Sequence, residues 1–293
     1  MAENNNTQNK KLPLEFFIWE VFLFSITLFL GIATSFQISG LISSQETPIS
    51  PISPWQFIFS FIVGTLLILS VIFFIKSKIK KGIIFKGLFI FVIFWGILLT
   101  LDVWLESFFF LSGAIFSLFL SSFLIFLLVK KSSVLIHNIC MVLGISGVGA
   151  ILGIRINPEA MVLLLIVFSI YDFIAVYKTK HMIAMAKEMV EHKAILAFIV
   201  PPKASDFKGS IKEVRPGGKF LILGGGDVAF PLMLCSSLLS RDIFSSLIVA
   251  IFSIIGLLFS FFIFTLQKER KAIPALPPIA LFCVLGYLIA LMI

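Results

Sequence analysis

Three acidic residues, Glu20, Asp172 and Asp227, lie within long apolar stretches of a chain that is 59% hydrophobic and only 13% charged. A carboxylate in the middle of a bilayer costs at least about 2.5–3.5 kcal/mol, so acids in such stretches are candidates for function. Glu20 lies about one helical turn inside its stretch, and we expect it to reach the aqueous interface. Asp172 and Asp227 are therefore the primary candidates.

The two aspartates are predicted to lie at the same depth. Asp172 precedes Lys178 by six residues, and Asp227 follows Lys219 by eight. With a helical rise of about 1.5 Å per residue, they lie roughly 9 and 12 Å from those lysines. The two helices run in opposite directions, so the sequence predicts that both carboxyl groups meet at one level.

Such a pair has a definite chemistry. Two carboxyl groups close together in a low dielectric cannot both ionise, so they hold one proton between them. The ionised partner draws a proton from water, while the protonated partner polarises a peptide carbonyl or protonates the leaving nitrogen. The pair titrates jointly, so the sequence assigns the proton to neither aspartate. This chemistry needs no metal, no cofactor and no covalent intermediate, and the three histidines show no ligand spacing.

Two patterns of backbone-altering residues accompany the acids. Gly224, Gly225 and Gly226 directly precede Asp227. Glycine lets another backbone approach closely, so we expect these positions to admit a substrate, although tight helix packing also uses glycine. The second pattern is Pro274-Ala275-Leu276-Pro277. Its prolines remove amide donors and leave carbonyls unpaired, although an ordinary helix start also favours proline.

The elements that must position these residues are membrane-spanning helices. A span needs about 20 mostly apolar residues, and the mean hydropathy of the chain is +1.12. The sequence predicts an all-α polytopic membrane protein with nine transmembrane helices. The predicted spans are Leu14–Phe36, Trp55–Ile75, Ile83–Leu101, Ser107–Val129, Val134–Ile154, Ala160–Tyr177, Phe220–Ser240, Ile243–Leu266 and Ala272–Met292.

Lysine and arginine are distributed unequally between the two sides that nine spans define. All 23 of them except Arg155 and Arg241 fall on the side of the N-terminus. Basic loops stay cytoplasmic, so we predict a cytoplasmic N-terminus and an extracytoplasmic C-terminus. The net charge of +8 is then explained by topology, and no nucleic-acid partner is expected.

The chain is predicted to divide into residues 1–154, an N-terminal bundle of helices 1 to 5, and residues 155–293, the catalytic helices 6 to 9. A cytoplasmic loop at about 178–219 joins helices 6 and 7. The pattern of its first part, Lys178–Ile195, fits an amphipathic helix on the membrane surface and equally an extension of the sixth span. The apolar run Ile195–Val200 follows, and then a polar stretch through Gly218 that we expect to be flexible.

Three motifs now stand in order: Tyr171-Asp172, Gly224-Gly225-Gly226-Asp227 and Pro274-Ala275-Leu276-Pro277. They resemble the YD, GxGD and PAL signatures of the presenilin and signal-peptide-peptidase family of intramembrane aspartyl proteases. The resemblance implies that Asp172 and Asp227 are the catalytic pair. The supporting residues that it implies are Tyr171, Gly224, Gly225, Gly226, Pro274, Ala275, Leu276 and Pro277.

The resemblance also implies an activity and partners. The expected protein is an endopeptidase that cleaves transmembrane helices of substrates crossing with their N-termini outside, as presenilins do. The short N-terminus and loop resemble microbial, especially archaeal, homologues, which implies the cell membrane of a prokaryote. Besides the lipid bilayer, no obligatory accessory subunit is expected, and a homo-oligomer is compatible. The substrate must unwind locally, and Ile195–Val200 and Lys219–Leu223 are predicted to pair with it as a short sheet.

A second class of function uses the same acids differently. A secondary transporter can use intramembrane carboxylates as proton or cation sites, and broken helices are common there. Transporters frequently contain inverted repeats, whereas each of the three motifs occurs once here. A prepilin-type peptidase, which shares a GxGD-like motif, has fewer helices and acids nearer the aqueous phase.

Overall fold

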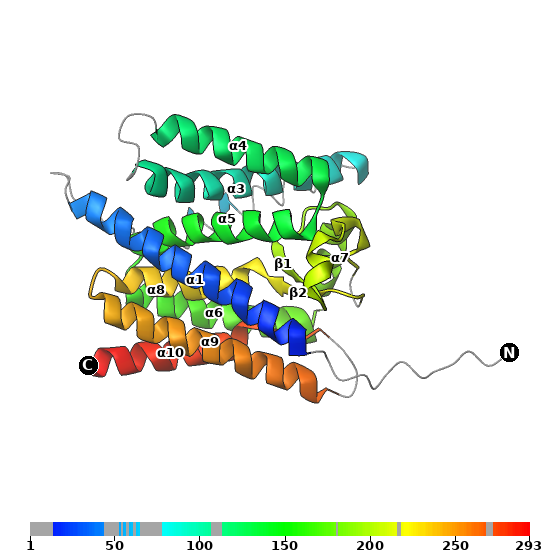
Figure 1. The fold of residues 1–293 in the computed structure, drawn as a ribbon. Helices are drawn as coiled ribbons and strands as arrows, with labels where there is room; N and C mark the ends of the chain where they lie inside the picture. The colour runs from blue at the N-terminus through cyan, green and yellow to red at the C-terminus, as the bar shows by residue number, and fades with distance from the viewer. Residues whose placement is uncertain are drawn as a thin grey trace.

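The computed structural model describes residues 14–43, 53, 55–56, 59–60, 63–64, 78–106, 113–179, 181–215, 218–267 and 272–293. Within them, apolar helices run along roughly one common direction, and a small helix and two strands gather at one end (Figure 1). The start of α1 lies at that same end, and the C-terminus lies at the opposite end. The helices are α1 (Leu14–Ser43), α3 (Lys78–Glu106), α4 (Gly113–Lys131), α5 (Val134–Arg155), α6 (Pro158–Tyr177), α7 (His181–Glu191), α8 (Gly225–Leu238), α9 (Ile243–Leu266) and α10 (Leu276–Met292).

The helices account for most of the predicted spans. Among the described residues, six helices are long and apolar enough to cross a membrane, namely α1, α3, α4, α5, α6 and α9. The shorter α8 and α10 are also apolar. The all-α class is thus confirmed, while the predicted span Trp55–Ile75 lies largely outside the described residues. The total of nine helices and their orientation stay predictions.

Two predicted spans are helical only in part. The segment Phe220–Gly224 is not helical, because strand β2 occupies Leu221–Gly224 and α8 begins only at Gly225. Similarly, α10 begins at Leu276 and leaves 272–275 outside the helix. Hydropathy does not distinguish a short buried strand from a turn of buried helix, which explains why the predicted bounds were wrong here.

A two-stranded antiparallel sheet supplies hydrogen-bond partners to the backbone where the chain is not helical. Strand β1 (Ala197–Val200) pairs with β2, with Ala197 opposite Gly224 and Val200 opposite Leu221. Strand β1 lies within Ile195–Val200, and β2 overlaps Lys219–Leu223 and extends one residue beyond it, so both strands form in the segments that were predicted to pair with a substrate. Buried backbone groups at membrane depth need such partners, and all four residues of β1 are buried.

The outer edge of β1 is occupied by side chains of α5. The Asn138 side chain donates from Nδ2 to the Ile199 carbonyl (2.7 Å) and accepts from the Ile199 amide at Oδ1 (3.0 Å). His137 Nε2 lies 2.9 Å from the Ala197 carbonyl oxygen. Because bonding alternates along an antiparallel strand, Ile199 faces α5, and its partner Ile222 faces away from β1. Within the part of the chain that the structure describes, the open edge of this two-stranded sheet is therefore that of β2.

The polar stretch after β1 is structured where the structure describes it. Two short 3₁₀ helices, Ala204–Lys208 and Ile211–Glu213, dock on the α4–α5 turn. There the Val134 amide donates to the Gly209 carbonyl (3.0 Å) and the Ile211 amide to the Ser132 carbonyl (2.8 Å). The expectation of a flexible segment is wrong for residues 203–215. The helical prediction for α7 is confirmed, and its place on the membrane surface stays a prediction.

Helix α8 is held tightly between α1 and α5. A Cβ at Gly149 of α5 would lie 2.6 Å from the Leu232 side chain, and one at Gly31 of α1 would lie 2.4 Å from the same residue. A Cβ at Gly153 would lie 2.6 Å from the Met233 carbonyl oxygen. Gly149 and Gly153 thus allow α5 to pack closely against α8, which leaves α8 little freedom to move.

Candidate active site

Asp172 is a buried side chain of α6 that meets the start of α10. It is 4% exposed, and its Oδ2 accepts a hydrogen bond from the Leu276 amide at 3.3 Å. Leu276 is followed by Pro277 and Pro278 in the first turn of α10. Proline has no amide hydrogen, so among these three positions only Leu276 can donate, and its amide is directed at the carboxylate.

Asp227 lies in the first turn of α8, and its carboxylate folds back over the end of β2. Gly224 is the N-cap of this helix, and the Gly224 amide hydrogen bonds to the Asp227 carboxylate. An acid at the third helical position that reaches back to the N-cap amide forms half of a capping box. The helix start therefore fixes the direction of this side chain.

The structure brings the two predicted carboxyl groups together. Asp227, 9% exposed, interacts electrostatically with Asp172, and α6 packs against α8. Two packed helices thus bring the acids within electrostatic range of each other, although the predicted depth of Asp227 assumed a helix where β2 lies. A pair of this kind, shielded from solvent, is suited to share a proton and to activate a water molecule.

The three glycines before Asp227 have different surroundings. A Cβ at Gly224 would lie 2.8 Å from Asp227 Oδ2, and one at Gly225 would lie 2.9 Å from the Leu196 carbonyl oxygen. Gly226 is exposed, and its nearest neighbour would be the Phe230 ring at 3.7 Å. The protein's own groups thus account for the first two glycines, and only Gly226 leaves space that a substrate backbone could enter.

The remaining motif residues frame the pair less directly. Tyr171 is 53% exposed and so lies on the outer face of α6, although it adjoins Asp172 in sequence. Pro274 is buried, and Ala275 forms the N-cap of α10. The PAL motif thus supplies one amide donor through its helix start, whereas the sequence suggested unpaired carbonyls.

The structure contradicts the prediction that Glu20 reaches the aqueous interface. Its side chain is only 6% exposed, and its Oε2 atom is buried without a hydrogen-bond partner. It interacts electrostatically with Asp227. The sequence shows that Glu20 lies near a helix start, but it does not show that β1 and the structured loop cover that end of α1, where Trp19 packs on Phe207 with ring centroids 4.9 Å apart.

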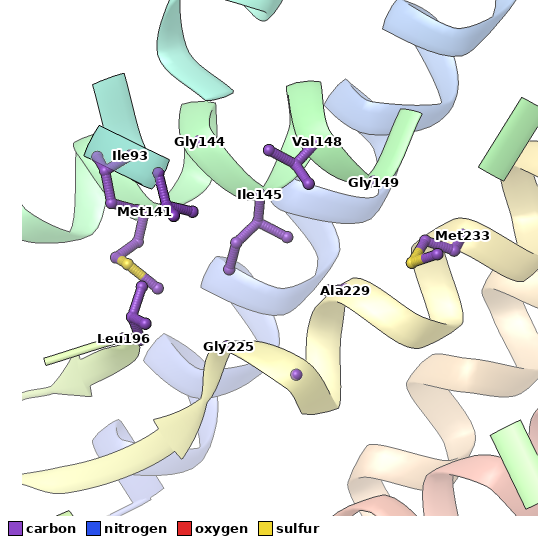
Figure 2. Close-up of a pocket in the computed structure, with 12 residues that line it drawn as sticks. Ile93, Met141, Gly144, Ile145, Val148, Gly149, Leu196, Gly225, Ala229 and Met233 are labelled. Carbon is purple, nitrogen blue, oxygen red and sulfur yellow. The ribbon is translucent and has the colours of Figure 1, made fainter. Parts of the chain in front are cut away.

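An apolar cavity of about 210 Å³ adjoins the same glycines. Its wall includes Met141 and Ile145 of α5, Leu196 just before β1, and Gly225 and Gly226 of α8 (Figure 2). Neither aspartate lines it. The cavity can hold an apolar group next to the start of α8 without bringing water there. Within the described part of the chain, no group of three or more His, Cys, Asp or Glu residues is arranged to hold a metal ion.

The fold and the site together define a class of protein. An apolar helical bundle that buries two interacting carboxyl groups, each bonded to a backbone amide, has the arrangement that a membrane-embedded hydrolase of the aspartyl type requires. The sequence profile of "Signal-peptide peptidase, presenilin aspartyl protease" matches residues 19–293. The chain belongs to this family, and it is a multi-pass membrane peptide hydrolase.

Solved structures show the same fold. A structure described as a presenilin family intramembrane aspartate protease in the C222 space group is 18% identical, with a TM-score of 0.61 over 93% of this chain and 96% of that one. A second, in the P2 space group, is 20% identical, with a TM-score of 0.59 over 92% and 96%. None of the curated proteins matches the chain. The transporter alternative gains no support from these comparisons.

Proposed function

We propose that Asp172 and Asp227 hydrolyse peptide bonds of membrane-spanning protein substrates, with a water molecule activated between them. The single observation that carries this proposal is the buried pair itself. Two carboxyl groups from adjacent helices interact electrostatically, and each is oriented by one backbone amide. Family membership supports the reaction type, and the geometry supports the choice of these two residues.

The catalytic steps follow from a pair that holds one proton. The ionised carboxylate takes a proton from water as the oxygen attacks the peptide carbonyl carbon. The protonated partner donates a hydrogen bond to the carbonyl oxygen and then gives its proton to the leaving nitrogen. The amides of Leu276 and Gly224 hold the two side chains in place, so little reorientation is needed when the substrate arrives.

We propose that the substrate binds as a third strand on the open edge of β2. A helical peptide bond is shielded by its own hydrogen bonds, so the cleavable segment must be extended. Ile222 faces away from β1, because Ile199 opposite it bonds to Asn138. Its amide and carbonyl are therefore oriented to pair with an added strand, only a few residues before Asp227. The adjoining apolar cavity suits an apolar side chain of that strand.

The aspartate assignment is tested by Asp172→Asn and Asp227→Asn. Either change removes one of the two carboxyl groups that share the proton. We therefore expect the rate at which the purified protein in detergent cleaves a fluorescent transmembrane peptide to fall by about four orders of magnitude or more. Asp102→Asn is the matched control, because Asp102 is a half-buried aspartate whose Oδ1 accepts from the Ser117 hydroxyl at 2.9 Å in the α3–α4 pair. Substantial cleavage by either site variant would refute the aspartyl mechanism.

The strand proposal is tested by Ile222→Pro beside Ile222→Ala. Proline removes one outward-facing amide, and an edge strand tolerates it. We expect the proline variant to retain its unfolding temperature and to cleave roughly ten-fold more slowly, because one hydrogen bond to the substrate contributes about 0.5–1.5 kcal/mol. The alanine variant, which keeps the amide, controls for the lost side chain. Equal rates for the two variants would mean that β2 does not pair with the substrate.

The orientation of the chain completes the proposal. With nine spans, the asymmetry of lysine and arginine supports a cytoplasmic N-terminus, and the sheet would then lie toward the cytoplasm. The start of α1, α7 and the sheet do lie at one end of the molecule (Figure 1). We further propose that the chain acts without an obligatory accessory subunit in a prokaryotic cell membrane. The division at residue 154 into two groups of helices stays a prediction.

A further inference from the structure

A group of four lysines lies at the end of α4, outside the site described above. Lys130 and Lys131 are the last two residues of α4, and both are exposed. Lys208 and Lys212 belong to the two 3₁₀ helices of the loop between β1 and β2, and both are exposed as well. These four residues are called the α4 basic surface below.

Backbone contacts bring the two pairs of lysines together. The Ile211 amide donates to the Ser132 carbonyl at 2.8 Å, and an antiparallel bridge joins Ser133 to Ser210. Ser132 directly follows the α4 pair, and Ser210 and Ile211 lie between the two loop lysines. Opposed residues of an antiparallel pair have Cα atoms about 4.5–5.5 Å apart. Long lysine side chains from both segments can therefore reach a single ligand.

The α4 basic surface adjoins an exposed apolar one. The Lys130 Nζ lies 5.2 Å from the centroid of the Phe126 ring, and Phe126 is 55% exposed. Helix α4 is apolar and long enough to cross a membrane, and it lies at the outer edge of the bundle (Figure 1). An exposed Phe on such a helix faces acyl chains, while a lysine stem beside it carries the ammonium group to the interface. The lysines thus lie at the level of lipid headgroups.

Nearby acids do not neutralise these lysines. Helices α4 and α5 contain no acidic residue. The two 3₁₀ helices contain one acid each, Asp206 and Glu213. Asp206 forms an ion pair with Lys219 at 2.7 Å, which leaves Glu213 as the single acid of these helices beside four lysines. A net positive surface next to an apolar one matches a ligand with an anionic head and an apolar tail.

We propose that the α4 basic surface binds the phosphodiester headgroup of an anionic phospholipid, with an acyl chain lying along the exposed face of α4. A headgroup held by both pairs of lysines also fastens the docked loop, whose ends continue into β1 and β2. The predicted orientation of the chain accounts for lysines on this side, but not for a folded loop that gathers two of them against the end of α4. No atom of the aspartate pair takes part, so the inference is independent of the proposed function.

The test compares binding of dioleoyl phosphatidylglycerol and dioleoyl phosphatidylcholine to the purified full-length protein by native mass spectrometry. A variant with both Lys130→Gln and Lys212→Gln removes one cation from each segment. A lysine near an anionic lipid surface contributes about fivefold in affinity. We therefore expect this variant to bind phosphatidylglycerol roughly 25-fold more weakly than the wild type does, with binding of phosphatidylcholine unchanged. The matched control combines Lys178→Gln and Lys187→Gln, which remove two exposed lysines elsewhere and should leave the preference intact.

Each outcome decides the proposal. Equal affinity of the wild type for the two lipids would overturn it, as would an equal loss in the control variant, which would show a general effect of net charge. A variant with Lys130→Arg and Lys212→Arg keeps both charges and should keep the preference, and its loss would exclude recognition by charge. Displacement of phosphatidylglycerol by millimolar glycerol phosphate would assign the site to a free phosphate ester instead of a lipid. Failure of the proposed function would appear separately, as cleavage by Asp172→Asn or Asp227→Asn.

Discussion

Helices α8 and α9 both begin beside an acidic residue, yet the two acids have opposite surroundings. Asp242 is the N-cap of α9, and its Oδ1 and Oδ2 accept from the Ser245 amide (2.7 Å) and hydroxyl (2.6 Å). Asp227 lies within the first turn of α8, is buried, and interacts with two other carboxyl groups. Asp242 stabilises a helix end, while Asp227 is placed where its charge is hardest to hold.

The difference shows what turns a capping acid into a reactive one. Both residues use the unpaired amides that every helix start offers. Asp242 is solvated, so its charge costs little. Asp227 is surrounded by buried apolar residues, and its helix starts late because β2 occupies the residues before it. Burial and neighbouring carboxyl groups, rather than position in the helix, give this acid its chemistry.

The largest expected contrast comes from the same substitution made in each helix. In Gly224→Ala the new Cβ would lie 2.8 Å from Asp227 Oδ2, so the carboxylate must move. A displacement of about 1 Å at a catalytic group can reduce the rate about 100-fold. In Gly256→Ala of α9, the new Cβ would lie 2.8 Å from the Ile279 Cα of α10. That variant should lose about 1–3 kcal/mol of stability by overpacking.

The two readouts should separate cleanly. We expect Gly224→Ala to lose activity with a nearly unchanged unfolding temperature, and Gly256→Ala to unfold earlier with nearly normal cleavage per folded molecule. Cleavage assays and thermal unfolding of the same detergent samples provide the comparison. A Gly256→Ala protein that folds stably but does not cleave would indicate that α9 takes part in the site.

A smaller contrast concerns the sheet that supports α8. Asn138→Leu keeps the size of the side chain but leaves the Ile199 amide and carbonyl unpaired, at a cost of about 1–3 kcal/mol for each group. Because β1 positions β2, cleavage per folded molecule should also fall. Thr100→Val is the control, since it removes a buried bond of 2.7 Å to the Leu143 carbonyl between α3 and α5. Thr100→Val should lower stability alone, and an equal loss of cleavage in both variants would contradict a specific role for the sheet.

The sequence predicted the regular parts of the molecule well. A long apolar run leaves few alternatives to a helix, so α5, α6 and α9 lie close to their predicted bounds, while α1 begins at Leu14 as predicted and continues past Phe36 to Ser43. The helical rise applies between Asp172 and Tyr177, whereas most residues between Lys219 and Asp227 are not helical. The depth that the spacing predicted for Asp227 therefore rested on a wrong assumption, although the two carboxyl groups do interact. Regularity is what made the helix predictions possible.

The irregular parts depend on contacts between residues distant in sequence. Strand β2 replaces a helical turn only because β1 is available to pair with it, and β1 is held by Asn138 from another helix. The burial of Glu20 arises from β1 and the loop residues that cover the start of α1. The role of Gly224 requires knowing where the Asp227 side chain points. Apolarity alone carries no signal for any of these contacts.

The smallest expected effect lies at the start of α9. Hydrogen bonds from the Ser245 hydroxyl and amide hold the pKa of Asp242 below its usual value. A lowered pKa in the folded state means that ionisation stabilises the fold above the unfolded pKa and that this contribution is lost as pH falls through the folded value. Asn remains a good N-cap, so Asp242→Asn should lower the unfolding temperature slightly at neutral pH and not at all in acid. Cleavage should be unchanged throughout, because Asp242 only caps the start of α9. A pH-dependent loss of cleavage in this variant would remove the distinction between the two acids.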